Sequence, residues 1–377
     1  MARNSTAVIL GFGILVCVIF FFFLSDDGRK ILQWRLIHGF RPDSLLLLKG
    51  SREPQVPCYF IFGDSLVDNG NNNHLQTSAK ANFAPYGIDF PQGPTGRFSN
   101  GRTYVDFLAK LLGFKRWIPP FATAREESIL TGVNYGSGGA GILDMTGQNL
   151  GEVISLNKQL RNHRSIVNRI ANKLGSKELA DHHLNQCLYT VGMGNNDYLN
   201  NYLSSKYPTS QLYTPDQYAT LLVQKLSHQL KKLYKLGARK IGVSEVGLLG
   251  CLPGVMGLNG STCVGYVNDY VKLFNHRLGP VVEGLNANLT DATFILLPSG
   301  NSSVPGVTIT NAPCCNVTSS GECFPNLVVC KNRTSYYFWD AFHPTDQVYK
   351  SAALSVYKVI STSILKEKAR TWMSFDQ

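Results

Sequence analysis

Short apolar runs alternate with longer segments of helical periodicity along most of this chain. Each run ends at a glycine or another turn-forming residue, which is typical of buried parallel strands. Strands are expected at residues 58–62, 132–135, 186–191, 238–246 and 293–297. Helices are expected at residues 103–112, 153–174, 216–236, 264–285 and 345–365. The alternation predicts an α/β fold, in which a five-stranded parallel sheet lies between helix layers in a single domain over residues 58–370.

The N-terminal segment departs from this pattern. Residues 7–24 form an uncharged run rich in Ile, Val, Leu and Phe, which is either a secretory signal peptide or a membrane anchor. Positive charge is heavier after the run than before it, which fits a simple signal peptide poorly. Residues 25–57 show no clean period, and we expect them to be a poorly ordered linker between the N-terminal segment (residues 1–24) and the fold.

The distribution of charge along the chain indicates which classes of binding partner to expect. The formal net charge is +11 over 377 residues, but the basic residues are scattered and form no long run. Without a basic stripe interleaved with aromatic residues, or zinc-finger spacing, binding to nucleic acid is not expected. We interpret the charge as a solubility property that also allows adhesion to cell-wall polyanions.

Cysteines and glycosylation motifs favour the secretory route. Of nine cysteines only Cys17 lies in the apolar run, and four fall within residues 314–330. Eight cysteines, partly clustered in a loop-like region, indicate disulfides and an oxidising compartment. The sequence contains no CxxC pair, so the cysteines give little support to a zinc site. Asn-x-Ser/Thr motifs occur at Asn259, Asn288, Asn301, Asn316 and Asn332. We expect a secreted, extracellular protein of the cell wall; the alternative is membrane anchoring through residues 7–24.

Ser65 follows the first expected strand and is the candidate nucleophile. The carboxyl ends of parallel strands form the edge where ligands bind in open α/β sheets. A serine hydroxyl needs a base, most often a histidine oriented by a carboxylate. Of eight histidines, His343 has an aspartate three residues before it, Asp340, at a spacing that lets the carboxylate reach Nδ1. The alternative is that Asp340 caps a helix and His343 is a surface residue.

Two further segments after expected strands offer hydrogen-bond donors. The Gly138-Gly139 turn exposes backbone N–H groups, and Asn196 adds a side-chain amide, as an oxyanion hole requires. The glycines could instead form a tight turn or a phosphate cradle, although no GxxxxGK[ST] motif is present. Asn196 could instead cap a helix. Asp64 is either a turn residue or a group that orients the loop around Ser65.

Four blocks in order resemble the GDSL esterase/lipase family of the SGNH hydrolase superfamily. These are FGDSL at 62–66, NYGSGGAG at 134–141, GNNDY at 194–198 and DAFHP at 340–344. The run DNGNNN at 68–73 is similar to the plant-type branch. One departure is that about thirty residues separate the apolar run from the first strand, whereas in the family this interval is usually short.

The resemblance implies a flavodoxin-like α/β/α fold and a serine esterase or lipase that acts through an acyl-enzyme. It implies Ser65 as nucleophile, His343 as base and Asp340 as its orienting partner. The Ser65 N–H, the N–H of Gly138 or Gly139, and the Asn196 side chain would form the oxyanion hole. The expected partner is a small-molecule or lipid ester, with no metal or other cofactor. The alternatives are an acyltransferase acting on a hydroxylated acceptor and a non-catalytic cell-wall-binding glycoprotein.

Overall fold

The computed structural model describes residues 53–257, 262–299 and 303–375, with side chains described up to residue 363. The predicted N-terminal segment, the linker up to residue 52, and the glycosylation motifs at Asn259 and Asn301 lie outside the described residues. Within the described residues, no helix is both long and apolar enough to cross a membrane.

Four parallel strands form the central sheet. In spatial order they are β1 (Tyr59–Gly63), β2 (Leu188–Gly192), β3 (Lys240–Ser244) and β4 (Thr293–Leu297). Their side chains are almost entirely buried, because helices cover both faces of the sheet, and this accounts for their uninterrupted apolar sequences. The predicted α/β fold with a parallel sheet is confirmed.

The predicted number of five strands is not met in the described residues. The expected strand at 132–135 lies beside β1 but forms only a single parallel bridge, between Asn134 and Ile61. Its start is broken by Gly132, whose φ of +119° is open to glycine, and a Cβ there would lie 1.9 Å from the Tyr59 carbonyl oxygen. On its outer side Asn134 pairs with Pro120, which has no N–H to extend a ladder.

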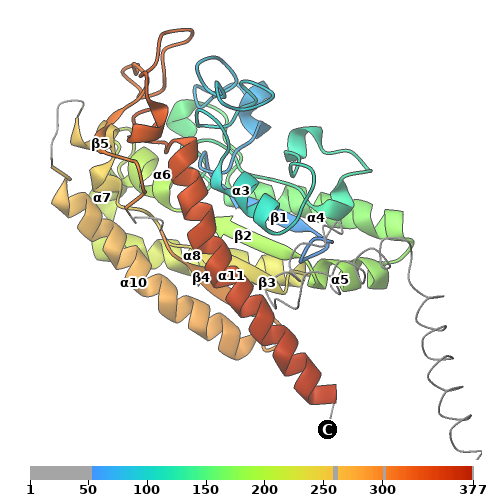
Figure 1. Ribbon diagram of the computed structural model, residues 1–377. Coiled ribbons are helices and arrows are strands. Elements are labelled where there is room, and N and C mark those ends of the chain that lie inside the picture. The colour runs from blue at the N-terminus through green and yellow to red at the C-terminus, as the bar shows by residue number, and fades with distance from the viewer. Residues whose placement is uncertain (1–52, 258–261, 300–302, 376–377) are drawn as a thin grey trace, which may run out of the picture. The chain divides into compact units, whose positions relative to one another are not determined.

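Side chains of β1 alternate between two apolar clusters on opposite faces of the sheet. Phe60 and Phe62 belong to the larger cluster, and Tyr59 and Ile61 belong to the other. The larger cluster is formed with α4 (Leu156–Leu174), α5 (Lys177–Asn185), α8 (Pro215–Lys235) and α10 (Gly265–Asn288). The smaller cluster is formed with α3 (Tyr104–Leu111) and α11 (Asp346–Phe375), which run side by side in Figure 1. The long predicted helices are all present, whereas α5 was not expected.

Short elements surround the edge formed by the carboxyl ends of the strands. They are α6 (Asn195–Asp197), α7 (Thr209–Leu212), α9 (Pro253–Met256), the π-helical turn Tyr198–Tyr202, and the parallel pair β5 (Ile309–Pro313) and β6 (Tyr336–Phe338). Five 3-10 turns add Asn71–His74, Phe121–Thr123, Gln148–Leu150, Leu249–Cys251 and Arg333–Ser335. This region lies at the top of Figure 1, where loops distant in sequence meet. The turn Ile129–Thr131 lies instead beside His183 at the opposite edge of the sheet.

The eight cysteines outside the N-terminal run form four disulfides. The pairs are Cys58–Cys187, Cys251–Cys263, Cys314–Cys330 and Cys315–Cys323. The last two close the loop between β5 and β6. The first joins the residues that immediately precede β1 and β2, so it fastens these strands at the edge opposite to Ser65.

A buried histidine lies within the larger apolar cluster. His163 on α4 is fully buried, and its ring contacts the aromatic rings of Phe60, Phe62, Tyr135 and Tyr189. Its Nδ1 lies 3.0 Å from the Tyr135 hydroxyl, and its Nε2 has no hydrogen-bond partner. Burial lowers the pKa of His163 to about 3.

The burial of this histidine predicts that acid destabilises the folded protein. Below pH 6.5 the unfolded chain takes up a proton on His163 that the folded chain does not, so the free energy of unfolding falls as pH falls. The loss between pH 7 and pH 4 is about 3 kcal/mol. We expect His163→Gln, which keeps a partner for Tyr135, to remove this part of the pH dependence in urea unfolding. The exposed His228 on α8 provides the control substitution His228→Gln.

Candidate active site

Ser65 lies just beyond the carboxyl end of β1, on a tight turn. The Asp64 carbonyl oxygen accepts hydrogen bonds from the N–H groups of Val67 and Asp68, and the Asp64 carboxylate accepts one from Leu66 N–H at 3.0 Å. The segment 132–135 lies on one side of β1 and β2 on the other, so the chain passes from β1 to one neighbour and then crosses to the other side of β1. Such a switch point leaves a crevice for a ligand, and Ser65 projects there.

A second segment brings a histidine and an aspartate to this serine. The His343 Nε2 lies 2.8 Å from Ser65 Oγ, and its Nδ1 lies 2.7 Å and 2.9 Å from the two Asp340 carboxylate oxygens. A carboxylate at Nδ1 retains the proton there, which leaves Nε2 free to accept one from Ser65. The turn is closed by a hydrogen bond of 2.7 Å from Trp339 N–H to the His343 carbonyl oxygen.

The Asp340 carboxylate is held in place by several hydrogen bonds. Its carboxylate accepts hydrogen bonds from the N–H groups of Phe342 and His343 and from the Tyr86 hydroxyl at 2.7 Å. Phe98 packs against the His343 ring at a centroid distance of 4.8 Å. Burial acts to lower the pKa of His343, but the Asp340 carboxylate, assisted by Asp64 and Glu322, outweighs burial and raises that pKa above its ordinary value.

The two adjacent glycines have different surroundings. Gly138 N–H donates a hydrogen bond of 3.0 Å to the Asp68 carboxylate, so this donor is already engaged. Gly139 has a φ of +80° and lines the cavity that contains Ser65. Asp68 also accepts from the N–H groups of Gly70 and Asn71, and burial raises its pKa to about 6 despite these donors.

Asn196 lines the same cavity from the segment after β2. One N–H of its amide donates to the Ala140 carbonyl oxygen at 3.0 Å, and its oxygen accepts from the Asn200 amide at 2.7 Å. The neighbouring Asn195 donates to the Asp64 carboxylate at 2.8 Å. Asp64 therefore has both roles considered for it from the sequence. It is a residue of the Ser65 turn, and it also orients this loop by joining it to the Asn196 segment. Its pKa is raised by burial, against these hydrogen bonds.

The asparagines after Ser65 join the loops of the site, a role that the sequence analysis missed. The Asn71 amide donates to the carbonyl oxygens of Asn134 and Gly136, and the Asn72 amide donates to those of Ala79 and Gly138. Both asparagines are buried. A run of asparagines directly after an expected nucleophile is the signal that could have indicated this role, because buried amides satisfy loop backbone groups.

The cavity has a volume of about 840 Å³ and contains both Ser65 and His343 in its lining. Much of the remaining lining is apolar, including Leu199, Leu252 and Val255. A cavity of this size with a few polar groups around a serine–histidine pair suits an organic ester with a hydrocarbon part.

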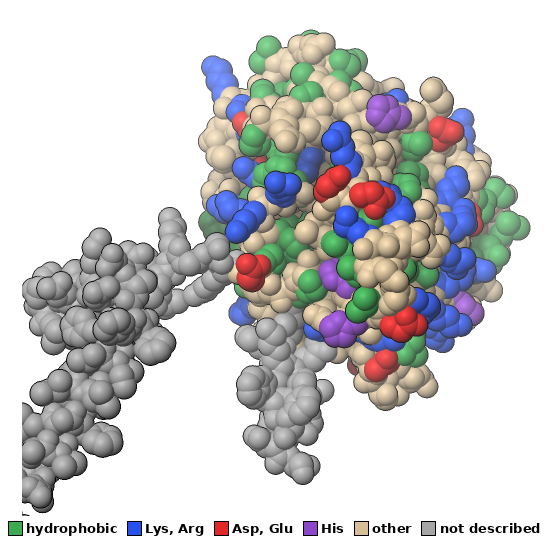
Figure 2. Space-filling model, turned by 90° about the vertical axis from the view of Figure 1, so that its right-hand side faces the viewer, with side chains coloured by type: hydrophobic (Ala, Val, Ile, Leu, Met, Phe, Trp, Pro, Cys, Tyr) green, Lys and Arg blue, Asp and Glu red, His purple; other side chains and the backbone are tan. Residues whose placement is uncertain are grey.

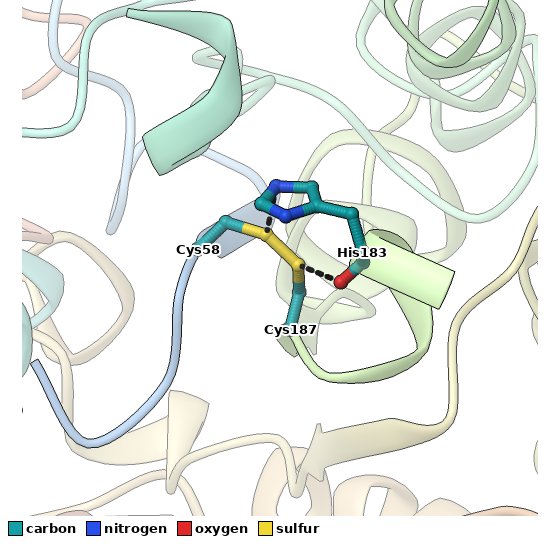
Figure 3. Close-up of side chains that lie close together, drawn as sticks. All are labelled: Cys58, His183 and Cys187. Atoms are coloured by element: carbon teal, nitrogen blue, oxygen red, sulfur yellow. Dashed lines mark hydrogen bonds between the residues drawn. A yellow bond between two sulfur atoms is a disulfide. The ribbon is translucent and has the colours of Figure 1, made fainter. Parts of the chain in front are cut away.

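Among the described residues, one cluster of metal-ligand types lies close together, at the opposite edge of the sheet. Figure 3 shows Cys58, His183 and Cys187, with His183 Nε2 at 3.3 Å from Cys58 Sγ. The two sulfurs are bonded to each other, whereas metal ligation requires thiolates. We therefore interpret this cluster as a buried disulfide with an adjacent histidine.

The predicted glycosylation sites that the structure describes are accessible. Asn288 at the end of α10, Asn316 in the disulfide-closed loop and Asn332 just after Cys330 are all exposed.

Comparison with known proteins identifies the family. The family described as GDSL-like Lipase/Acylhydrolase matches residues 59–356. The GDSL esterase/lipase At1g29660 of Arabidopsis thaliana is 45% identical over 345 residues, which cover 88% of this chain and 93% of that protein. The GDSL esterase/lipase At5g45670 of the same plant is 47% identical over 307 residues, which cover 78% and 85%. The chain therefore belongs to the GDSL lipase/acylhydrolase family of serine carboxylic ester hydrolases.

Proposed function

We propose that this protein is a secreted esterase that hydrolyses carboxylic esters through an acyl-enzyme on Ser65. The observation that carries the proposal is the chain of short distances from Ser65 Oγ through His343 to Asp340. The non-catalytic alternative is disfavoured because this hydrogen-bonded geometry is complete and opens into a cavity.

In the first step Ser65 Oγ attacks the ester carbonyl carbon, and its proton passes to His343 Nε2. The tetrahedral intermediate collapses as Nε2 returns that proton to the departing alkoxide, which leaves as an alcohol. Water then attacks the acyl-enzyme, giving a proton to Nε2, and the acid leaves when Ser65 Oγ regains a proton. Asp340 stabilises the imidazolium that forms in both halves.

Three donors would stabilise the oxyanion: the Ser65 N–H, the Gly139 N–H and the second N–H of the Asn196 amide. We assign the glycine donor to Gly139 rather than Gly138, because the Gly138 N–H bonds to Asp68. The Asn196 amide is already oriented by Ala140 and Asn200, so it needs no reorganisation during the reaction.

Removing the Asn196 donor should affect turnover more than binding. We expect Asn196→Ala to lower kcat about 10²–10³-fold with little change in KM, since the oxyanion forms only in the transition state. Steady-state hydrolysis of p-nitrophenyl esters measures this. The exposed Asn172 on α4 provides the control substitution Asn172→Ala. A loss in kcat below threefold would exclude Asn196 from the oxyanion hole.

A fluorophosphonate probe tests the nucleophile directly. We expect the wild-type protein to lose esterase activity as it gains one phosphonyl group, and peptide mass spectrometry to place that group on Ser65. The reaction should slow strongly in a His343→Ala variant, because the hydroxyl then lacks its base. Labelling on another residue, or active protein that never reacts, would contradict the assignment.

Secretion is supported by chemistry typical of the extracellular environment. All eight cysteines outside the N-terminal run are paired, and the described glycosylation motifs are exposed. Sequencing of the mature N-terminus by mass spectrometry would distinguish a cleaved signal from an anchor at residues 7–24. Finding the apolar run intact in the mature protein would support the anchor instead.

A further inference from the structure

The cavity around Ser65 differs in charge from the rest of the molecule. The chain has 36 lysines and arginines, yet none is among the described residues that line the cavity. The ionisable side chains of that lining include three carboxyl groups, of Asp64, Glu245 and Glu322, together with His343. Figure 2 shows the contrast on the outside, where Lys and Arg side chains are spread over the visible face.

The carboxyl groups are fixed in place by local hydrogen bonds. Glu322, in the disulfide-closed loop, accepts hydrogen bonds from the Ser320 and Thr318 hydroxyls. Glu245, at the end of β3, accepts one from Ser299 N–H at 3.3 Å. Both side chains are half-buried. Negative charge is therefore positioned around the cavity rather than carried on mobile surface side chains.

A substrate that enters this cavity leaves water and meets these groups. A negative charge on the substrate would be repelled by these carboxyl groups. This repulsion is stronger in a partly buried site than in water. Its hydration would also be lost without a cationic partner to replace it. A hydrocarbon chain has neither cost and gains contact with apolar residues such as Leu199, Leu252 and Val255.

We propose that this cavity selects esters whose acyl chain is uncharged and apolar, and rejects acyl chains that carry a carboxylate. The proposal rests on the proposed esterase function and goes beyond it by naming the substrate class. It assigns Glu322 and Glu245 as specificity-determining residues. The acid product carries the charge that the cavity disfavours, so the same carboxyl groups favour its release.

A pair of matched esters tests the selection. The p-nitrophenyl esters of 4-methylpentanoate and of succinate have acyl chains of similar shape, but only the second carries a free carboxylate. We expect kcat/KM for the succinate ester to be at least about tenfold lower at low ionic strength. The difference should shrink as salt is added, because screening weakens the repulsion. Rates in a Ser65→Ala variant provide the non-enzymatic background for both esters.

Variants connect the selection to the two glutamates. Glu322→Gln and Glu245→Gln should each raise the succinate to methylpentanoate ratio of kcat/KM by about threefold or more, and their combination should raise it further. Glu283→Gln on α10, an exposed glutamate outside the cavity lining, should leave the ratio unchanged. Each glutamate variant is measured separately, so that the second variant still tests the selection if the first fails to fold.

The outcomes separate two hypotheses. Equal hydrolysis of both esters by the wild type, or a ratio that neither glutamate variant moves, would overturn the charge selection and leave the esterase function standing. Hydrolysis of neither ester above the Ser65→Ala background would instead contradict the proposed function itself. A ratio that is low in the wild type and rises in the variants would support both.

Discussion

Replacing Ser65 by alanine is expected to abolish ester hydrolysis, with a loss in kcat of about 10⁶-fold. The hydroxyl is the group that bonds His343 Nε2 at 2.8 Å, and no acyl-enzyme can form without it. The remaining oxyanion donors and the cavity would still bind substrate, so a small residual rate over water is consistent with this expectation. Single-turnover assays with p-nitrophenyl butyrate measure the loss.

The fold should survive this change, because Ser65 lies at the rim of the cavity and is only half-buried. Circular dichroism and Tm should therefore match the wild type. Ser244, another serine of the cavity lining, provides a matched control, and Ser244→Ala should retain activity within about tenfold. Substantial turnover by a purified Ser65→Ala protein would remove Ser65 from the mechanism.

Changing Asp340 to asparagine is expected to lower kcat about 10⁴-fold without unfolding the protein. An asparagine oxygen can still accept from the N–H groups of Phe342 and His343, as the Asp340 carboxylate does. Its amide nitrogen would then face Nδ1 of His343 and donate to it. The imidazole proton would move to Nε2, where it prevents His343 from accepting the Ser65 proton.

Tyr86 separates this tautomer effect from a general disturbance of Asp340. Tyr86→Phe removes one hydrogen bond to the carboxylate but leaves the charge and Nδ1 contact, so we expect a loss of about tenfold or less. Steady-state kinetics of the two variants in parallel make the comparison. If Asp340→Asn lost no more activity than Tyr86→Phe, Asp340 would not set the histidine tautomer.

Much of the fold could be predicted from local pattern. The strand at 293–297 agrees with β4 at both ends, because an apolar β-branched and aromatic run is bounded there by turn residues. The fifth strand was overpredicted, because periodicity shows apolar character but not the number of ladder partners. Asn134 finds Ile61 on one side and Pro120 on the other, and neither bridge extends into a strand.

For the candidate site, too, the residue types could be predicted from the sequence, but the hydrogen bonds between distant loops could not. Residue types and spacing made Ser65, Asp340 and His343 candidates, and the family resemblance implied their roles. The structure brings the three side chains within hydrogen-bond distance. The choice between Gly138 and Gly139 depends on Asp68, which lies 70 residues away in sequence from the glycine it binds. Hydrogen bonds of that kind follow from how loops pack, so a single sequence does not disclose them.

The position of Asp340 and His343 late in the chain has a consequence for biosynthesis. The proposed nucleophile and the proposed oxyanion donors all precede residue 200, whereas the proposed base follows the loop closed by Cys314–Cys330 and Cys315–Cys323. Cys323 N–H also bonds the Tyr86 hydroxyl that holds Asp340. A nascent chain that has not yet reached residue 340 therefore contains Ser65 but neither Asp340 nor His343. We therefore expect the proposed catalytic hydrogen bonds to form only after this loop and the segment that contains Asp340 and His343 have been synthesised.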